Sequence, residues 1–309
     1  MIQLEGLSKN FGSNLAVDNL SLKIDEGSVF GFLGPNGAGK TTTIRMLCSL
    51  ITPSHGKAFI DNIDTTNESE VLKIRRMIGL LPEAPGLYDS LSAYRNLDFY
   101  AQLYGLSSSQ REENIEKFLK MFGLWDRKDE PVGNYSKGMR QKIAISRALV
   151  HDPKILFLDE PTSGLDPESA KTIRDFILEL KKEKRTIFLN THNLDEAGRI
   201  CDKIGIIRNK LIKIGSPNEL GDQIGKRQIS FNMKEIDEKI ISVVQSISAV
   251  KNVEHVKNVL ICEVDDPENM NPIIIEKIVK AGGKIQYVND MRRSLEDVYL
   301  DIIKEDKSH

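Results

Sequence analysis

The sequence lacks several features that would assign it to a specialised class of protein. No run approaches the about 18 consecutive apolar residues that a membrane-spanning helix requires. Its 3 cysteines, Cys48, Cys201 and Cys262, are isolated in the sequence, which argues against a disulfide framework and a cysteine metal site. The first residues, MIQLEGLSKNFG, favour a strand and a turn over a signal peptide. We therefore expect a cytosolic protein with buried thiols.

An excess of positive charge is also missing. The formal net charge is −2, and acidic and basic residues are nearly balanced both in 1–225 and in 226–309. This balance argues against nucleic acid as a general partner. With 40% hydrophobic and 28% charged residues, the composition is that of a soluble globular protein. Its 309 residues leave room for about two domains.

As far as Ser216, short apolar runs alternate with amphipathic stretches. Residues 28–33, 154–159 and 186–190 have the β-branched and aromatic composition of buried strands. Residues 168–183 place their apolar side chains on one face of a helix. This alternation predicts an α/β fold with a mainly parallel sheet and helices on both of its faces.

The pattern changes after a turn-rich link at 215–226. Residues 226–309 give the order strand, helix, strand, strand, helix, strand, which predicts a small α+β, ferredoxin-like domain. We expect a last helix over 294–305 to close it. The domain prediction is thus 1–220 and 226–309.

Residues 34–41, GPNGAGKT, match G-x-x-x-x-G-K-[ST] between a predicted strand and a predicted helix. In such a loop, backbone N–H groups and the helix N-terminus surround phosphates, which makes a chance glycine-rich turn a poor alternative. Lys40 would reach the β- and γ-phosphates, and the Thr41 hydroxyl would bind Mg²⁺. The phosphate-binding residues expected here are Gly34, Pro35, Asn36, Gly37, Ala38, Gly39, Lys40, Thr41 and Thr42.

Two other predicted strands end in polar residues that suit the same chemistry. Asp159 and Glu160 follow an apolar strand, so Asp159 would hold Mg²⁺ through water and Glu160 would act as general base. A solvated acidic pair is the alternative interpretation. His192 follows the next strand and could donate to a γ-phosphate, although a lone histidine is as readily structural.

The stretch NYSKGMRQK, 134–142, predicts a helix start with Ser136 as its N-cap and Gly138 leaving the backbone accessible. Cations crowd its first turns, although the helix dipole favours anions there. The sequence therefore suggests a second anion site.

The ordered motifs GPNGAGKT, SKGMRQ, LFLDEPTSGLDP and NTHN resemble the nucleotide-binding subunit of ABC transporters over roughly 1–220. The resemblance implies a P-loop NTPase fold with a helical subdomain at about 84–150, and ATP and Mg²⁺ as cofactors. It implies that Ser136 and Gly138 touch the γ-phosphate of ATP bound by another subunit. Two such subunits, identical or paralogous, would pair head to tail around two ATP molecules.

Other roles are implied residue by residue. Phe11 resembles the aromatic residue that stacks on adenine, the alternative being a core phenylalanine. Asp166 resembles the aspartate that links the two sites of the dimer, and His192 resembles the switch histidine. Glu83 stands where most members have a glutamine that contacts Mg²⁺ and lies at the surface facing the transporter. A carboxylate can accept a hydrogen bond but cannot donate one unless it is protonated, so Glu83 would fill only part of the glutamine's role.

The signature loop departs from the usual Leu-Ser-Gly-Gly-Gln at Tyr135, Lys137 and Met139. With the C-terminal segment, this resembles the subfamily that drives drug, sodium-ion or peptide-antibiotic exporters. The resemblance implies a separately encoded membrane permease and a peripheral location on the cytoplasmic face of the membrane. The surface of 88–125, together with Glu83, would then receive a helix of the permease. The alternative is that the tyrosines of this segment pack inside the helical subdomain. They are Tyr88, Tyr94, Tyr100 and Tyr104.

An alternative function is a soluble ABC ATPase that acts on ribosomes or in cluster assembly. Ribosomal members generally carry two cassettes, whereas this chain has one phosphate loop. Cluster-assembly members would not need the C-terminal domain.

Overall fold

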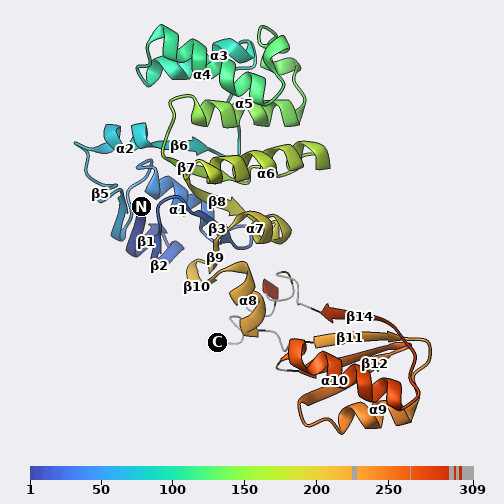
Figure 1. The fold of residues 1–309 in the computed structure, drawn as a ribbon. Helices are drawn as coiled ribbons and strands as arrows, with labels where there is room; N and C mark the ends of the chain where they lie inside the picture. The colour runs from blue at the N-terminus through green and yellow to red at the C-terminus, as the bar shows by residue number, and fades with distance from the viewer. Residues whose placement is uncertain (225–227, 265, 292–295, 297–298, 301–309) are drawn as a thin grey trace. The chain divides into compact units, whose positions relative to one another are not determined.

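The computed structural model describes residues 1–224, 228–264, 266–291, 296 and 299–300. The chain divides into two compact units, Met1–Pro217 and Asn218–His309 (Figure 1).

The first unit is built on a sheet with the strand order β10-β9-β3-β8-β7-β6. Neighbouring strands are parallel except for β10, which pairs antiparallel with β9. The mainly parallel sheet predicted from the sequence is therefore confirmed. Its strands are β3 (Val29–Leu33), β6 (Ile78–Leu81), β7 (Ile155–Asp159), β8 (Thr186–Thr191), β9 (Lys203–Arg208) and β10 (Lys210–Gly215).

Aromatic packing holds the middle of this sheet together. Phe188 of β8 lies between Phe32 of β3 and Phe157 of β7, with ring centroids 5.2 Å and 5.7 Å away. All three side chains are fully buried. Since burying one such side chain is worth about 1.5–3 kcal/mol, this cluster fixes the strands whose ends carry the polar motifs.

A second, antiparallel sheet has the strand order β2-β1-β4-β5. The simple alternation of strands and helices was wrong for this part of the chain, because β1, β2 and β3 follow one another without a helix. A tight turn lets β1 pair directly with β2, which parallel strands cannot do. These strands are β1 (Ile2–Phe11), β2 (Asn14–Ile24), β4 (His55–Ile60) and β5 (Ile63–Asp64).

Five helices of the described part of the first unit, α3 to α7, begin at a side-chain cap. Ser92 caps α3, Ser107 caps α4 within a capping box, and Ser136 caps α5 by accepting from the Met139 N–H, as the sequence predicts. Figure 1 shows α3, α4 and α5 grouped together in this unit. The helices are α1 (Lys40–Leu47), α2 (Val71–Met77), α3 (Ala93–Leu103), α4 (Ser108–Met121), α5 (Lys137–Leu149), α6 (Pro167–Lys182) and α7 (Leu194–Ile200).

The second unit follows the predicted strand and helix order. Its sheet is antiparallel, in the order β12-β13-β11-β14, and α9 and α10 pack on it through Ile240, Val244, Ile274 and Ile278. This arrangement confirms the small α+β fold. The elements are β11 (Gln228–Met233), α9 (Glu238–Gln245), β12 (Val250–Val256), β13 (Val259–Val264), α10 (Pro267–Lys280) and β14 (Ile285–Met291).

The region of the predicted link contains a helix, α8 (Pro217–Ile224), so a link made of turns alone was wrong. Proline suits the first turn of a helix, and Leu220 is fully buried. Most of the closing helix expected over 294–305 lies outside the described residues. Among the described residues, no helix has the length and apolar character needed to cross a bilayer.

Candidate functional site

The loop 34–41 joins β3 to α1 and leaves the start of that helix open. Gly39 has a φ of 92°, and a Cβ there would overlap the carbonyl oxygen of Ala16, so only glycine fits. No side chain among the described residues caps α1. Its first N–H groups therefore remain available to an anion.

Lys40, the first residue of α1, is buried against this loop. Its Nζ donates to the carbonyl oxygens of Gly34 and Pro35 at 2.7 Å and 3.1 Å. Burial lowers the pKa of Lys40, and the negative charges of Glu160 and Asp159 oppose that shift. A partly desolvated ammonium group held against this loop suits recognition of a charged phosphoryl group.

Asp159 ends β7 and has both carboxylate oxygens engaged. The Thr41 hydroxyl donates to Oδ2 at 2.8 Å, and the Asn190 amide donates to Oδ1 at 3.1 Å. Asn190 faces Asp159 because β7 and β8 run parallel in that register. Sequence reasoning missed Asn190, although its position in the strand before His192 was the available signal.

Glu160 and His192 come together across the ends of β7 and β8. His192 Nδ1 lies 2.8 Å from Glu160 Oε2, with the glutamate side chain 12% and the histidine 60% exposed. Glu160 has a φ of 52°, which is uncommon for a residue with a Cβ, and its N–H donates to the Asn190 carbonyl. Left-handed backbone of this kind gathers at functional sites.

A cavity of about 360 Å³ unites most of the predicted nucleotide site. Phe11 lines its edge and is 49% exposed, so the alternative of a core phenylalanine was wrong. Glu83 lines this cavity and also a smaller one of about 210 Å³. The predicted residues on the wall are Phe11, Asn36, Gly37, Ala38, Gly39, Lys40, Thr41, Thr42, Glu83, Asp159 and Glu160.

The oxygen atoms of Thr41, Asp159 and Glu83 are of the kind that Mg²⁺ prefers. Among the described residues, no group of three or more His, Cys, Asp or Glu side chains could hold a metal ion. Mg²⁺ is usually bound by one or two carboxylates together with substrate phosphates, and Asp159 and Glu83 are two carboxylates on the wall of this cavity.

The second predicted anion site lies elsewhere in the unit. Among the described residues on the wall of the 360 Å³ cavity, none is Ser136, Gly138 or Asp166. Gly138 packs against Ser169 so closely that a Cβ would overlap the Ser169 hydroxyl. Asp166 caps α6 by accepting from the Ser169 N–H at 2.9 Å. Hydrogen bonds from the backbone and the side chain of Ser169 lower the pKa of Asp166.

Gln141 is another residue that sequence reasoning missed. It is buried in α5, and its Nε2 donates to the carbonyl oxygen of Pro161 at 2.8 Å. This hydrogen bond ties the helix that begins at Ser136 to the segment directly after Glu160. A polar residue on the apolar face of a predicted helix was the signal that could have revealed it.

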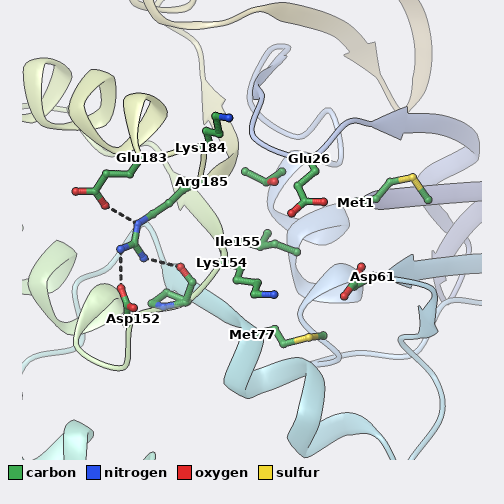
Figure 2. A pocket seen from close by; sticks show the side chains of 12 residues that line it. Met1, Glu26, Asp61, Met77, Asp152, Lys154, Ile155, Glu183, Lys184 and Arg185 are labelled. Atoms are coloured by element: carbon green, nitrogen blue, oxygen red, sulfur yellow. Dashed lines mark hydrogen bonds and ion pairs between the residues drawn. The ribbon is translucent and has the colours of Figure 1, made fainter. Parts of the chain in front are cut away.

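A cavity of about 380 Å³ lies at the other end of β7 and β8, where these strands begin (Figure 2). Arg185 is held at its edge by Asp152, Glu183 and the Pro153 carbonyl oxygen. Because ligands of open α/β sheets bind at the carboxyl ends of the strands, this cavity is a weaker candidate than the one at Lys40.

Two family models match the chain. The model described as "ABC transporter" matches residues 17–163, and the model described as "ATP-binding protein DrrA1-3-like, C-terminal domain" matches residues 215–303.

Curated relatives share much of the chain. The ABC transporter ATP-binding protein NatA of Bacillus subtilis (strain 168) is 44% identical over 214 residues, which cover 68% of this chain and 86% of that protein. The bacitracin transport ATP-binding protein BcrA of Bacillus licheniformis is 33% identical over 308 residues, covering 98% and 97%.

Solved ATP-binding cassettes share the fold of the first unit. One of them is a dimeric cassette in a post-hydrolysis state bound to ADP and Pi. It is 28% identical, with a TM-score of 0.65, and the match covers 70% of this chain and 98% of that one.

Proposed function

Because the chain belongs to the ABC transporter family of ATP-binding proteins, we propose that it binds and hydrolyses ATP to power an export system. The observation that carries this proposal is the convergence of Lys40, Thr41, Asp159 and Glu160 on one cavity. These residues come from two distant segments of the chain, 40–41 and 159–160. Together they supply a cation for the phosphates, oxygen ligands for Mg²⁺ and a general base, which phosphoryl transfer to water needs.

The phosphate loop and the acidic side chains divide the work of binding. Residues 34–42 surround the phosphates, and Lys40 pairs with the β- and γ-phosphates. Thr41, Asp159 through water, and Glu83 would hold Mg²⁺, which when bound neutralises charge on the phosphates. Phe11 stacks on the adenine ring with its exposed face.

Glu160 is the proposed general base. It accepts a proton from a water molecule as that water attacks the γ-phosphorus, and the bond to the bridging oxygen breaks to release ADP and phosphate. His192 Nδ1 lies 2.8 Å from Glu160 Oε2, so in this proposal the hydrogen bond to the γ-phosphate comes from Nε2 of the imidazolium, in which both ring nitrogens are donors. Holding both groups on neighbouring strand ends keeps them oriented before ATP arrives.

The second anion site belongs to a partner subunit in this proposal. Ser136 and Gly138 lie outside the chain's own cavity, and the dimeric cassette among the similar structures supports an arrangement of two subunits. We propose a head-to-tail dimer, of identical or paralogous chains, in which these residues contact the partner's ATP. Asp166, which caps the helix packed on Gly138, then links the two sites.

We propose that the permease is a separate chain that binds beside Glu83. Tyr88 is 47% exposed, and its ring lies 5.4 Å from Phe99 and 6.3 Å from Tyr100. Tyr104 instead stacks internally on His151. The cluster Tyr88–Phe99–Tyr100 is thus the part of the helical subdomain that offers an aromatic surface to a permease.

Export, rather than import, is favoured by the similarity to a further relative, the Nod factor export ATP-binding protein I of Cupriavidus metallidurans, which is 38% identical over 223 residues. Coupling to a permease implies that the chain acts at the cytoplasmic face of the membrane. We also propose that 1–220 is the ATPase and 226–309 an accessory domain, so truncation after Lys226 should leave a soluble fragment that binds ATP.

Purification of the tagged chain from membranes tests the proposed export function. We expect a membrane protein with several spans to copurify, and a Tyr88→Ala/Phe99→Ala variant to lose it while keeping ATP binding. Leu72→Ala, at another exposed apolar residue, is the matched control. A wild-type protein that copurifies only ribosomes or cluster-assembly proteins would overturn the export function.

A further inference from the structure

Glu196 is a buried acidic residue beside the candidate site that the proposed mechanism does not use. It lies in the first turn of α7 and is 1% exposed. Glutamate is rarely buried to this degree without partners, because burial penalises its charged form. A residue of this kind calls for a structural or functional explanation.

The contacts of Glu196 join two segments that carry candidate catalytic residues. Its Oε2 accepts from the Thr162 hydroxyl at 2.7 Å and from the Thr191 hydroxyl at 3.2 Å. Thr162 follows Glu160 and Pro161, while Thr191 directly precedes His192. The carboxyl group therefore connects the segment after the proposed base to the end of the strand that carries the histidine.

Helix capping alone does not account for the carboxyl group. Asn193 caps α7 by accepting from the Glu196 N–H at 3.0 Å. In a capping box, the glutamate side chain would accept from the Asn193 N–H in return. That N–H instead donates to the Thr191 hydroxyl at 3.0 Å, which leaves the Glu196 carboxyl free to reach Thr162.

We propose that Glu196 is a positioning residue for ATP hydrolysis, because its carboxyl group joins Thr162 to Thr191 and so holds Glu160 and His192 together. This proposal rests on the proposed function, in which Glu160 accepts the proton. Misplacing a reacting group by about 1 Å can slow a reaction about 10²-fold. Loss of the link should therefore slow the chemical step and leave the nucleotide-binding loop intact.

The surroundings of Glu196 identify glutamine as its conservative replacement. Burial raises the pKa of Glu196, the two threonine hydroxyls and the charge of Arg174 oppose that shift, and the charge of Glu160 adds to it. Oε1 is buried and has no hydrogen-bond partner among the described residues. A neutral amide of the same size keeps the oxygen that accepts from Thr162 and Thr191.

The test compares Glu196→Ala, Glu196→Gln and Thr162→Val in the full-length chain by steady-state hydrolysis and by ATP affinity. We expect Glu196→Ala to lower kcat about tenfold or more with ATP affinity within about threefold, and Glu196→Gln to restore kcat to within about threefold of wild type. Thr162→Val should also lower kcat. The Glu196→Ala/Thr162→Val double variant should be little slower than Glu196→Ala, since both changes remove one link.

A wild-type kcat in Glu196→Ala would overturn the proposal. So would parallel losses of kcat, ATP affinity and melting temperature that glutamine does not rescue, because that pattern indicates a purely structural role. If Glu196→Ala does not fold, Thr162→Val becomes the test of the proposal. The proposal then requires the kcat of Thr162→Val to fall while its ATP affinity stays unchanged. Glu160→Gln is measured alongside, and full activity in that variant overturns the role of Glu160 as general base, on which this proposal rests.

Discussion

The starts of α1 and α5 are the two helix ends at which the sequence predicts an anion site, and the chain completes them in different ways. At α1 no described side chain caps the helix, and Lys40 lies against the open loop. At α5 Ser136 caps the helix, and Gly138 is packed against Ser169. One end is therefore left open toward a cavity of its own chain. The other is completed by local contacts, and Ser136 and Gly138 lie outside that cavity.

The largest effect should come from the α1 side of this comparison. Glu160→Gln removes the proton acceptor while keeping the size of the side chain, so kcat should fall about 10²-fold or more. ATP affinity should remain near wild type, because Glu160 is not a proposed phosphate ligand. Phosphate release and light scattering measure turnover and the expected ATP-held dimer. Hydrolysis close to wild type would contradict the role of Glu160.

A charge placed at the α5 start separates its capping from its role toward a partner. Ser136→Asp keeps a good N-cap and adds a negative charge, whereas Ser136→Asn keeps the cap without the charge. We expect Ser136→Asp to hydrolyse ATP about 10- to 100-fold more slowly, since it repels the γ-phosphate, and Ser136→Asn to be much less affected. Equal activity of the two variants would remove the distinction between the helix ends.

Mixing two impaired variants tests whether Ser136 acts on the ATP of its own chain or on that of a partner chain. Lys40→Ala damages the phosphate loop and Ser136→Asp damages the signature loop. In a head-to-tail mixed dimer one site collects both lesions and the other has none, so hydrolysis should partly recover. If each chain used its own Ser136, no mixture would recover. Flat titrations with mixed dimers confirmed by mass would thus refute the composite site.

Gly138→Ala should lower the stability of the protein, whatever its effect on ATP hydrolysis. A Cβ at Gly138 overlaps the Ser169 hydroxyl, so we expect a loss of about 1–3 kcal/mol in the free energy of unfolding. Ser169→Gly removes the obstructing side chain and should recover part of that loss in the double variant. Urea unfolding measures the difference, and additive effects would contradict the contact.

The smallest effect is expected at the rim of the α1 cavity. Phe11→Ala should weaken ATP binding about fivefold or more by removing the stacking surface, whereas Phe11→Tyr should bind within about twofold of wild type. Nucleotide titration monitored by fluorescence measures both variants. Unchanged affinity in Phe11→Ala would remove Phe11 from the adenine site.

The sequence identified the groups at the strand ends because local chemistry and position coincide there. Asp159 and Glu160 follow an apolar strand in a chain that also has a phosphate loop. Because the ends of parallel strands meet at one edge of the sheet, this order predicts that the two acidic side chains lie near the phosphate loop. By contrast, Asn190 and Glu196 act through partners that only the pairing of β7 with β8 and the packing of α7 bring close. The antiparallel sheet of β1 was missed because strand composition does not specify which strands pair.

Helix ends were easier to predict than connections. Ser136 was recognised as a cap because capping depends on a few neighbouring residues. Helix α8 was missed because the proline and glycine residues of 215–226 resemble turns, although proline is also favoured in the first turn of a helix. The fold class could be predicted from the pattern of apolar and polar residues. The pairing of strands and the partners of buried polar side chains could not, because they depend on contacts between residues far apart in the sequence.

The left-handed backbone at Glu160 has an evolutionary consequence. Glycine would adopt this conformation at lower energetic cost than glutamate, by about 1 kcal/mol, and the contact with the largely exposed His192 adds little to stability. Selection for thermal stability alone would thus favour Glu160→Gly and yield a more stable protein that lacks the proposed general base. Directed evolution of this chain should therefore select for turnover at every round.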